Sequence, residues 1–134
     1  ASIRERTRHG AFHRRTKIGV EDGPAASGLY GATKVWMEEM ANAAAMEARG
    51  ALTVIAVRFG NVNRDNDTKH EYPLYLSHSD CVQFIERCLA TKALPWFSTF
   101  FAISDNACNP FDIASARQML GYKPEDGVDC PFPV

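Results

Sequence analysis

The chain has 134 residues, of which 46% are hydrophobic and 23% are charged, and its formal net charge at pH 7 is -1. That length allows one domain at most, and the near-neutral charge gives no general attraction to nucleic acid or to a membrane surface. No apolar run approaches the roughly 20 residues that are needed to span a bilayer.

Residues 1–27 form the first segment, which shows no sustained periodicity. Turn signals occur at Gly10, at Gly19 and at the Gly23-Pro24 pair, so we interpret the segment as a long loop. Its opening is rich in arginine. This is typical of a solvated surface loop, which we favour, and also of a transit peptide or an anion-binding patch.

A helix is expected over residues 29–49, with Ser27 as its N-cap and Gly50 as its stop signal. The segment is rich in alanine, methionine and glutamate, which are good helix formers. A stripe of small or adaptable side chains along it favours close packing against another helix. The stripe consists of Met37, Ala41, Ala44, Ala45 and Ala48.

Residues 52–57 are continuously apolar and mostly β-branched. Such a run indicates a strand that is covered on both faces, as in a parallel sheet. A polar loop is expected over residues 61–71, and a short extended piece is expected at 75–76.

Residues 77–92 have the pattern of a helix, which Ser77 and Asp80 open in the manner of a capping box. Residues 96–103 form a second apolar strand, and a last short helix is expected over 110–120. Alternating helices and apolar strands predict an α/β layered sheet. Two strands do not make a stable parallel sheet, so we expect the chain to be part of a larger fold.

Tyr30 and Lys34 form a Tyr-x-x-x-Lys pair at the start of the first expected helix. Residues four apart share one face of a helix, so the phenol and the ammonium can point into one cleft. A neighbouring ammonium favours the phenolate, and such a tyrosine can act as general base on a substrate hydroxyl. The same spacing also occurs where a tyrosine ring lies at a core edge beside a solvated lysine.

Short motifs follow one another along the chain: LYGATK at 29–34, VRFGNV at 57–62, YLSHSD at 75–80, Cys88-Leu89, FAISDN at 101–106 and LGYKPED at 120–126. In this order they resemble the C-terminal half of an extended short-chain dehydrogenase/reductase, of the NAD-dependent epimerase/dehydratase family. Within that family they are most similar to the uronate dehydrogenases. The resemblance implies a Rossmann-like doubly wound parallel sheet whose N-terminal cofactor-binding half is absent from this chain.

By this resemblance the chain is a single partial domain. Residues 1–27 are a loop region, residues 28–60 are the catalytic helix and strand, and residues 61–134 are the substrate-side part. Tyr30 is the general base, and Lys34 holds the ribose of NAD or NADP while it favours the phenolate.

The resemblance implies further site residues. Ser2 is the candidate for the third catalytic residue. Arg58 and Gly60 join the catalytic pair on the cofactor side, and Asn61 and His70 lie on the substrate side. A sugar-type small molecule is the expected substrate, and a cytoplasmic homodimer is the expected form.

The sequence departs from the family in two respects. It contains no Gly-x-x-Gly-x-x-Gly turn to receive the cofactor pyrophosphate. We therefore expect the chain to be a truncated product, a fragment or one piece of an assembly. Uronate dehydrogenases hold the substrate carboxylate with an arginine, whereas His70 beside Lys69 aligns here without a guanidinium fork.

Three interpretations of the function therefore stay open. The first is a dehydrogenase that acts on a sugar or sugar-acid hydroxyl. The second is a sugar epimerase or dehydratase that recycles bound NAD. The third is a non-catalytic fragment that folds by self-association.

The cysteines show no Cys-x-x-Cys spacing, so a zinc site is not expected. Free thiols in a reducing cytosol are expected instead. The four positions are Cys81, Cys88, Cys108 and Cys130.

Overall fold

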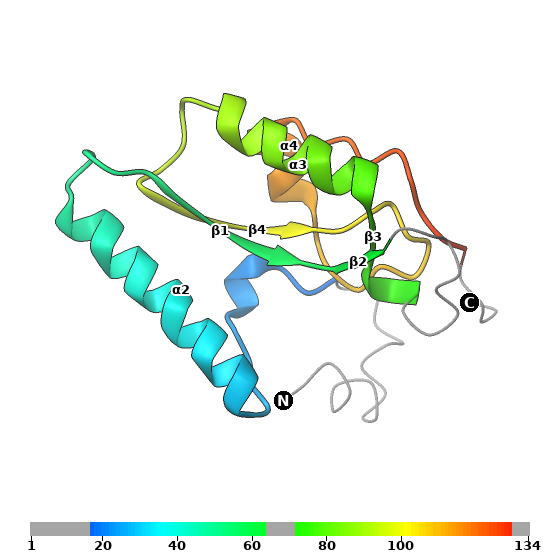
Figure 1. The fold of residues 1–134 in the computed structure, drawn as a ribbon, viewed down its shortest axis with the longest axis horizontal. Coiled ribbons are helices and arrows are strands. Elements are labelled where there is room, and N and C mark those ends of the chain that lie inside the picture. Colours follow the sequence, from blue (N-terminus) through cyan, green and yellow to red (C-terminus); the bar gives the residue numbers. More distant parts are fainter. Residues whose placement is uncertain (1–16, 64–71, 130–134) are drawn as a thin grey trace.

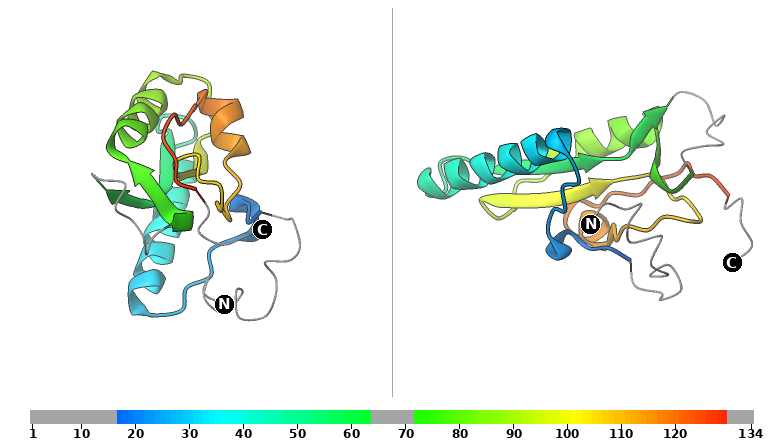
Figure 2. Two further views of the ribbon diagram at one scale, coloured as in Figure 1. Left: turned by 90° about the vertical axis from the view of Figure 1, so that its right-hand side faces the viewer. Right: turned by 90° about the horizontal axis from the view of Figure 1, so that it is seen from below.

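The structure is a computed structural model, and it describes residues 17–63 and 72–129. A central pair of parallel strands separates two layers (Figures 1 and 2): helices α3 and α4 cover one face, and helix α2 covers the other. The elements in chain order are η2 (Val20–Asp22), α2 (Leu29–Glu47), β1 (Val54–Phe59), β2 (Asn61–Asn63), η3 (Tyr72–Leu74), β3 (Tyr75–Ser77), α3 (His78–Ala90), β4 (Phe97–Ala102) and α4 (Ala114–Leu120).

The strands pair in parallel, as the sequence predicted. In the central pair, residues 54–59 of β1 align one to one with residues 97–102 of β4. The second pair joins β2 to β3, with Asn61 opposite Tyr75. The predicted α/β fold is therefore confirmed. The expected loop over 61–71 begins instead as strand β2, because its backbone finds a partner in β3.

The apolar core lies mainly between the central strands and the layer of α3 and α4. Phe84 of α3 is fully buried, and its ring meets that of Tyr122 edge-on at 4.9 Å. Successive strand residues face opposite sides, so Phe100 of β4 belongs to this core while Phe101 faces α2. The ring of Phe101 lies 4.5 Å from that of Phe111. On the α2 side the packing is thinner.

Helix α2 has 19 residues and begins directly after Gly28, which supplies no side-chain cap. The prediction of Ser27 as N-cap was therefore wrong by one residue, and the helix ends at Glu47. Within the described residues α2 packs against β1 and β4. Ala45 is the buried residue of this helix, whereas Met37 of the predicted stripe is 55% exposed. The stripe is thus divided between the sheet side and the open side of the helix.

Ser77 caps α3 as predicted, because its Oγ accepts a hydrogen bond from the Asp80 amide at 3.0 Å. The reciprocal bond of a capping box is replaced, since the Ser77 amide donates to Ser104 Oγ at 3.0 Å. The buried Asp80 carboxylate accepts bonds from the Ser104 hydroxyl at 2.5 Å and from the amides of Glu125 and Asp126 at 2.8 and 3.2 Å. Asp80 therefore joins the start of α3 to the C-terminal segment.

Candidate active site

Tyr30 and Lys34 lie in the first two turns of α2, and the structure brings them together. Lys34 Nζ lies 5.2 Å from the centroid of the Tyr30 ring, which is a cation–π distance. Both side chains are exposed, Tyr30 to 77%. A ligand can therefore reach the phenol and the ammonium from one side of the helix.

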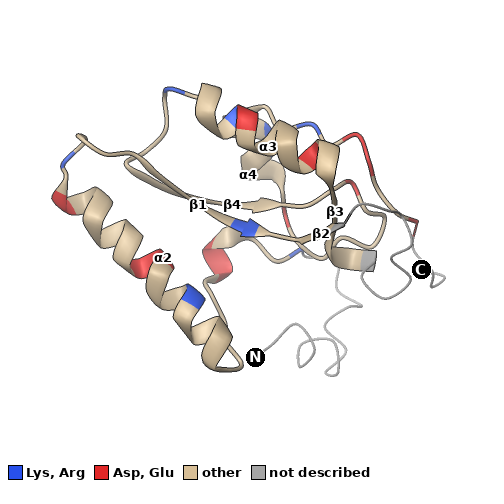
Figure 3. Cartoon of the chain, in the orientation of Figure 1, with Lys and Arg blue, Asp and Glu red and all other residues tan. Residues whose placement is uncertain are grey.

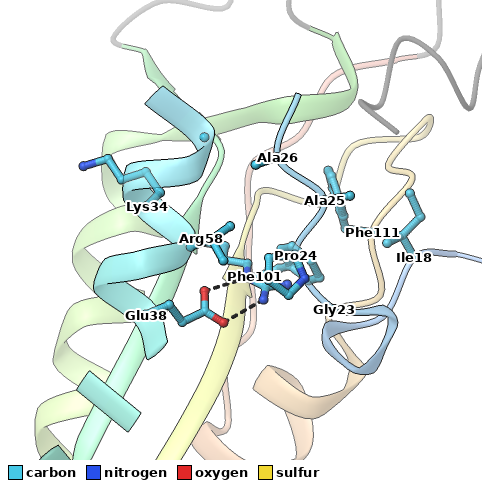
Figure 4. A pocket seen from close by; sticks show the side chains of 12 residues that line it. Ile18, Gly23, Pro24, Ala25, Ala26, Lys34, Glu38, Arg58, Phe101 and Phe111 are labelled. Carbon is cyan, nitrogen blue, oxygen red and sulfur yellow. Dashed lines mark hydrogen bonds and ion pairs between the residues drawn. The ribbon is translucent and has the colours of Figure 1, made fainter. Parts of the chain in front are cut away.

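A pocket of about 260 Å³ lies beside this pair, between α2, the central strands and the loop that precedes α2 (Figure 4). Its charged lining residues are Lys34, Glu38 and Arg58, and its floor includes Phe101 and Phe111. Figure 4 shows that Lys34 extends away from Arg58 and Glu38. The ammonium thus lies toward the solvent side, and the ion pair lies deeper.

Arg58, which was predicted to contact the cofactor, forms a two-point ion pair with Glu38. Its Nη2 and Nε donate to Glu38 Oε1 and Oε2 at 2.7 and 3.1 Å. The guanidinium carbon lies 5.5 Å from the centroid of the Phe101 ring. Sequence reasoning missed Glu38, although its place four residues after Lys34 was an available signal. Contact between Arg58 and a cofactor stays a prediction.

Gly60 and Asn61 follow β1 directly, where the chain passes into β2. The Gly60 amide donates to the Ala102 carbonyl at 2.9 Å. A Cβ at Gly60 would lie 2.3 Å from the carbonyl oxygen of Leu74, so packing of two backbones already requires glycine there. Asn61 is exposed and pairs with Tyr75 through the backbone. Their predicted binding roles stay predictions.

Ser2, His70 and Lys69 lie outside the described residues. The predicted roles of Ser2 as third catalytic residue and of His70 on the substrate side therefore stay predictions.

The exposed pair fits one end of a dinucleotide. The Lys34 ammonium offers three hydrogen-bond donors and the Tyr30 hydroxyl both donates and accepts, which suits the hydroxyls of a ribose. Binding of a pyrophosphate at a helix N-terminus uses a glycine-rich turn, and the sequence has no Gly-x-x-Gly-x-x-Gly motif. The residues present thus fit the nicotinamide-ribose end.

The described cysteines differ from the expectation of free thiols at one position. Cys81 and Cys88 are free, and burial raises the pKa of both thiols. Cys108 is disulfide-bonded, which corrects the expectation there.

In the part of the chain that the structure describes, no group of three or more His, Cys, Asp or Glu residues could hold a metal ion. No helix in the described ranges is both long and apolar enough to cross a membrane.

Comparison with known proteins finds partial matches, and no family model matches the chain. The uncharacterized protein YtbQ of Bacillus subtilis is 32% identical over 114 residues, which cover 81% of this chain and 44% of YtbQ. The NAD-dependent glucose-6-phosphate dehydrogenase of Haloferax volcanii is 30% identical over 118 residues, which cover 85% of this chain and 43% of that enzyme. The chain thus spans less than half the length of these curated relatives.

Solved structures of similar fold are also matched over a part of their length. The glucuronic acid dehydrogenase from Chromohalobacter salexigens has a TM-score of 0.71 at 20% identity, covering 84% of this chain and 41% of that one. The uronate dehydrogenase from Agrobacterium tumefaciens has a TM-score of 0.69 at 27% identity, covering 83% and 40%. A mutant of the latter, complexed with NAD, also matches with a TM-score of 0.69.

These matches first define the class: the chain has the mixed α/β architecture, with parallel strands, of part of a Rossmann-like dehydrogenase. More particularly, the predicted resemblance to the uronate dehydrogenases is confirmed as a partial match.

Proposed function

We propose that the complete protein containing these residues is an NAD-dependent oxidoreductase that acts on a hydroxyl of a sugar or sugar acid. The observation that carries the proposal is the Lys34 ammonium over the Tyr30 ring, 5.2 Å from its centroid, on an accessible helix face. The partial similarity to dehydrogenases that are named for NAD, glucose 6-phosphate and uronate supports the substrate class.

In the proposed mechanism Tyr30 removes the proton from the substrate hydroxyl. Lys34 stabilises the phenolate and binds the cofactor ribose, so one cation serves two tasks. Ser2 would donate a hydrogen bond that orients the substrate oxygen. NAD, when bound, supplies the hydride acceptor that such an oxidation needs.

The remaining predicted residues take secondary roles in this proposal. Gly60 belongs to the cofactor side, and Arg58 serves that side through its ion pair with Glu38 of α2, within a catalytic part that spans residues 28–60. Asn61 and His70 belong to the substrate side, within residues 61–134.

Replacement of Tyr30 by phenylalanine tests the mechanism. Tyr30→Phe keeps the ring and removes the acid–base hydroxyl, so turnover should fall by roughly 10²- to 10⁴-fold. NADH formation by the complete protein is measured with glucuronate, a second uronate and glucose 6-phosphate. Met37→Leu, an exposed change on the same helix, should keep normal turnover. Wild-type turnover in Tyr30→Phe would show that the phenol is not the base.

We also propose that the protein associates as a homodimer through the open side of α2. This side, called the outer face below, carries exposed large apolar side chains, and burying them needs a partner surface. They are Leu29, Trp36, Met37 and Met40.

A further inference from the structure

Apolar packing holds α2 only weakly on the sheet. Of its 19 residues Ala45 is the buried one, and an alanine side chain contributes little apolar area. Its large side chains are turned outward, with Trp36 at 64% and Met40 at 54% exposed. The position of this helix therefore depends on some other contact.

The ion pair between Arg58 and Glu38 supplies that contact. Arg58 comes from β1 and Glu38 from α2, and the Thr99 hydroxyl of β4 also donates to Glu38 Oε1 at 3.4 Å. The side chains of the pair are 21% and 17% exposed, so water screens them less than it screens a surface pair. A guanidinium fork on a carboxylate fixes orientation as well as distance. One contact thus joins the helix to both central strands.

The ion pair between Arg58 and Glu38 lies close to the candidate catalytic residues along α2. Glu38 follows Lys34 by one helical turn and Tyr30 by two turns. Lys34, Glu38 and Arg58 line the same pocket (Figure 4). Because these positions belong to one continuous helix, a shift or rotation of the backbone at Glu38 moves Tyr30 and Lys34 with it.

We infer that Arg58 and Glu38 are positioning residues for Tyr30 and Lys34. Their ion pair sets the place of α2 on the sheet and thereby the distance of the phenol and the ammonium from a bound cofactor and substrate. The inference rests on the proposed function, since it concerns the placement of that catalytic helix. Tyr30 and Lys34 move as one body, so their mutual geometry survives the loss of the pair.

Two conservative variants in the complete protein test this assignment. Glu38→Gln keeps the shape and removes the charge, and Arg58→Lys keeps the charge and removes the fork. Since a misplacement of about 1 Å can cost about 100-fold in rate, we expect kcat to fall and KM for NAD to rise, each by about tenfold or more. The pH at half-maximal rate should stay unchanged, whereas Lys34→Ala should move it.

Two readouts do not depend on activity. Amide hydrogen exchange in α2 should become faster in both variants, and calorimetry should show at least tenfold weaker NAD binding. The double variant should lose no more than the worse single one, because the residues act as a unit. Glu39→Gln is the matched control: it is the adjacent, exposed carboxylate of α2, and it should leave every readout unchanged.

Wild-type kinetics and α2 exchange in both variants would overturn the inference. The inference would also be overturned if KM for NAD rises in Arg58→Lys while Glu38→Gln keeps wild-type kinetics. Arg58 would then contact the cofactor itself. If Glu38→Gln does not fold, hydrogen exchange of Arg58→Lys without NAD decides: faster exchange in α2 supports the inference, and wild-type exchange overturns it. The proposed function fails separately if Tyr30→Phe keeps its turnover, whereas hydrogen exchange still reports whether the pair fixes α2.

Discussion

Gly60 lies at a point where backbone segments approach too closely for a side chain. Its amide is bonded to the Ala102 carbonyl, and a Cβ would lie 2.3 Å from the Leu74 carbonyl oxygen. The obstacle is backbone, which cannot rotate aside as a side chain can. A glycine that was predicted from the sequence to serve the cofactor therefore also has a purely structural requirement.

Gly60→Ala should consequently destabilise the protein by about 1–3 kcal/mol, as expected for overpacking. Urea unfolding followed by circular dichroism measures the free energy of unfolding. Gly28→Ala serves as the comparison without a steric clash, because a Cβ there has nothing within 4 Å. Gly28 is the N-cap of α2, so this variant should lose only the smaller stability that alanine costs at a cap, about 0.5–1 kcal/mol. Equal unfolding midpoints for Gly60→Ala and the wild type would contradict the close approach.

The Tyr30–Lys34 pair was predictable at the residue scale, whereas its support was not. A spacing of four on a helix is a local property, and it placed the two side chains together. The partner of Glu38 is Arg58, which lies 20 positions away on a strand. Only the packing of α2 on the sheet brings these charges together, so no local pattern contained the contact.

At the scale of elements, buried polar groups bind the C-terminal segment, residues 122–126, to the start of α3 and to the end of β4. Asp80 accepts bonds from the segment's amides, and the Tyr122 hydroxyl donates to the Ile103 carbonyl at 3.1 Å. Burial first, and the nearby Asp80 charge second, raise the pKa of Tyr122. At the edge of this contact the Ser79 hydroxyl donates to the Asp126 carboxylate.

Asp126 gives this contact a pH dependence. Hydrogen bonds from Ser77 and Ser79 hold its pKa below the ordinary value, which is about 3.9 in an unfolded chain. The stabilisation is therefore fully present above that value and is lost as the pH falls through the lower, folded pKa. Asp126→Asn should destabilise the protein slightly at pH 7, because Asp126 is exposed, and the difference from wild type should shrink below about pH 4.

Urea unfolding at pH 7, 5 and 3 measures this difference. Asp129→Asn, an exposed change just after this segment, is the control, and it should show no comparable narrowing between pH 5 and 3. A difference between Asp126→Asn and wild type that stays constant from pH 7 to pH 3 would show that the Asp126 charge has no part in the contact.

The existence of the strands and of the cap on α3 was predictable, but their limits and partners were not. The run at 52–57 predicted a strand, which forms over Val54–Phe59 because pairing with β4 sets its ends. The serine cap followed from the local pattern. The reciprocal bond from Asp80 did not form, since Ser104 and the segment at 125–126 are better placed to use its carboxylate.

At the scale of the whole molecule, the two layers are unequal. The layer of α3 and α4 contains most of the core. Helix α2 has few charged positions along its length (Figure 3), and the large apolar side chains of its outer face are exposed. The curated relatives are more than twice the length of the matched segment. The fold class was predictable from apolar strands alternating with helices. The surface that packs on the outer face was not predictable, because the sequence of a helix does not determine which partner buries its apolar side.

A homodimer through the outer face is the prediction that belongs to this scale. Exposed apolar area of this kind is removed from water when two copies pack face to face, and a twofold arrangement pairs like with like. Met40→Glu places a charge in the middle of that face, so the complete protein should change from dimer to monomer. Sedimentation velocity measures the change, and the unfolding midpoint should decrease only through the loss of association.

Leu89→Glu provides the matched control for this experiment. Leu89 is also an exposed apolar residue of a helix, at 83%, but it belongs to α3 on the opposite layer. If any added charge on an exposed leucine or methionine disrupts the dimer, Leu89→Glu does so equally, and the outer face of α2 has no special role. A wild-type protein that sediments as a monomer at high concentration rejects the dimer itself. A dimer that is lost in Met40→Glu and kept in Leu89→Glu assigns the interface to α2.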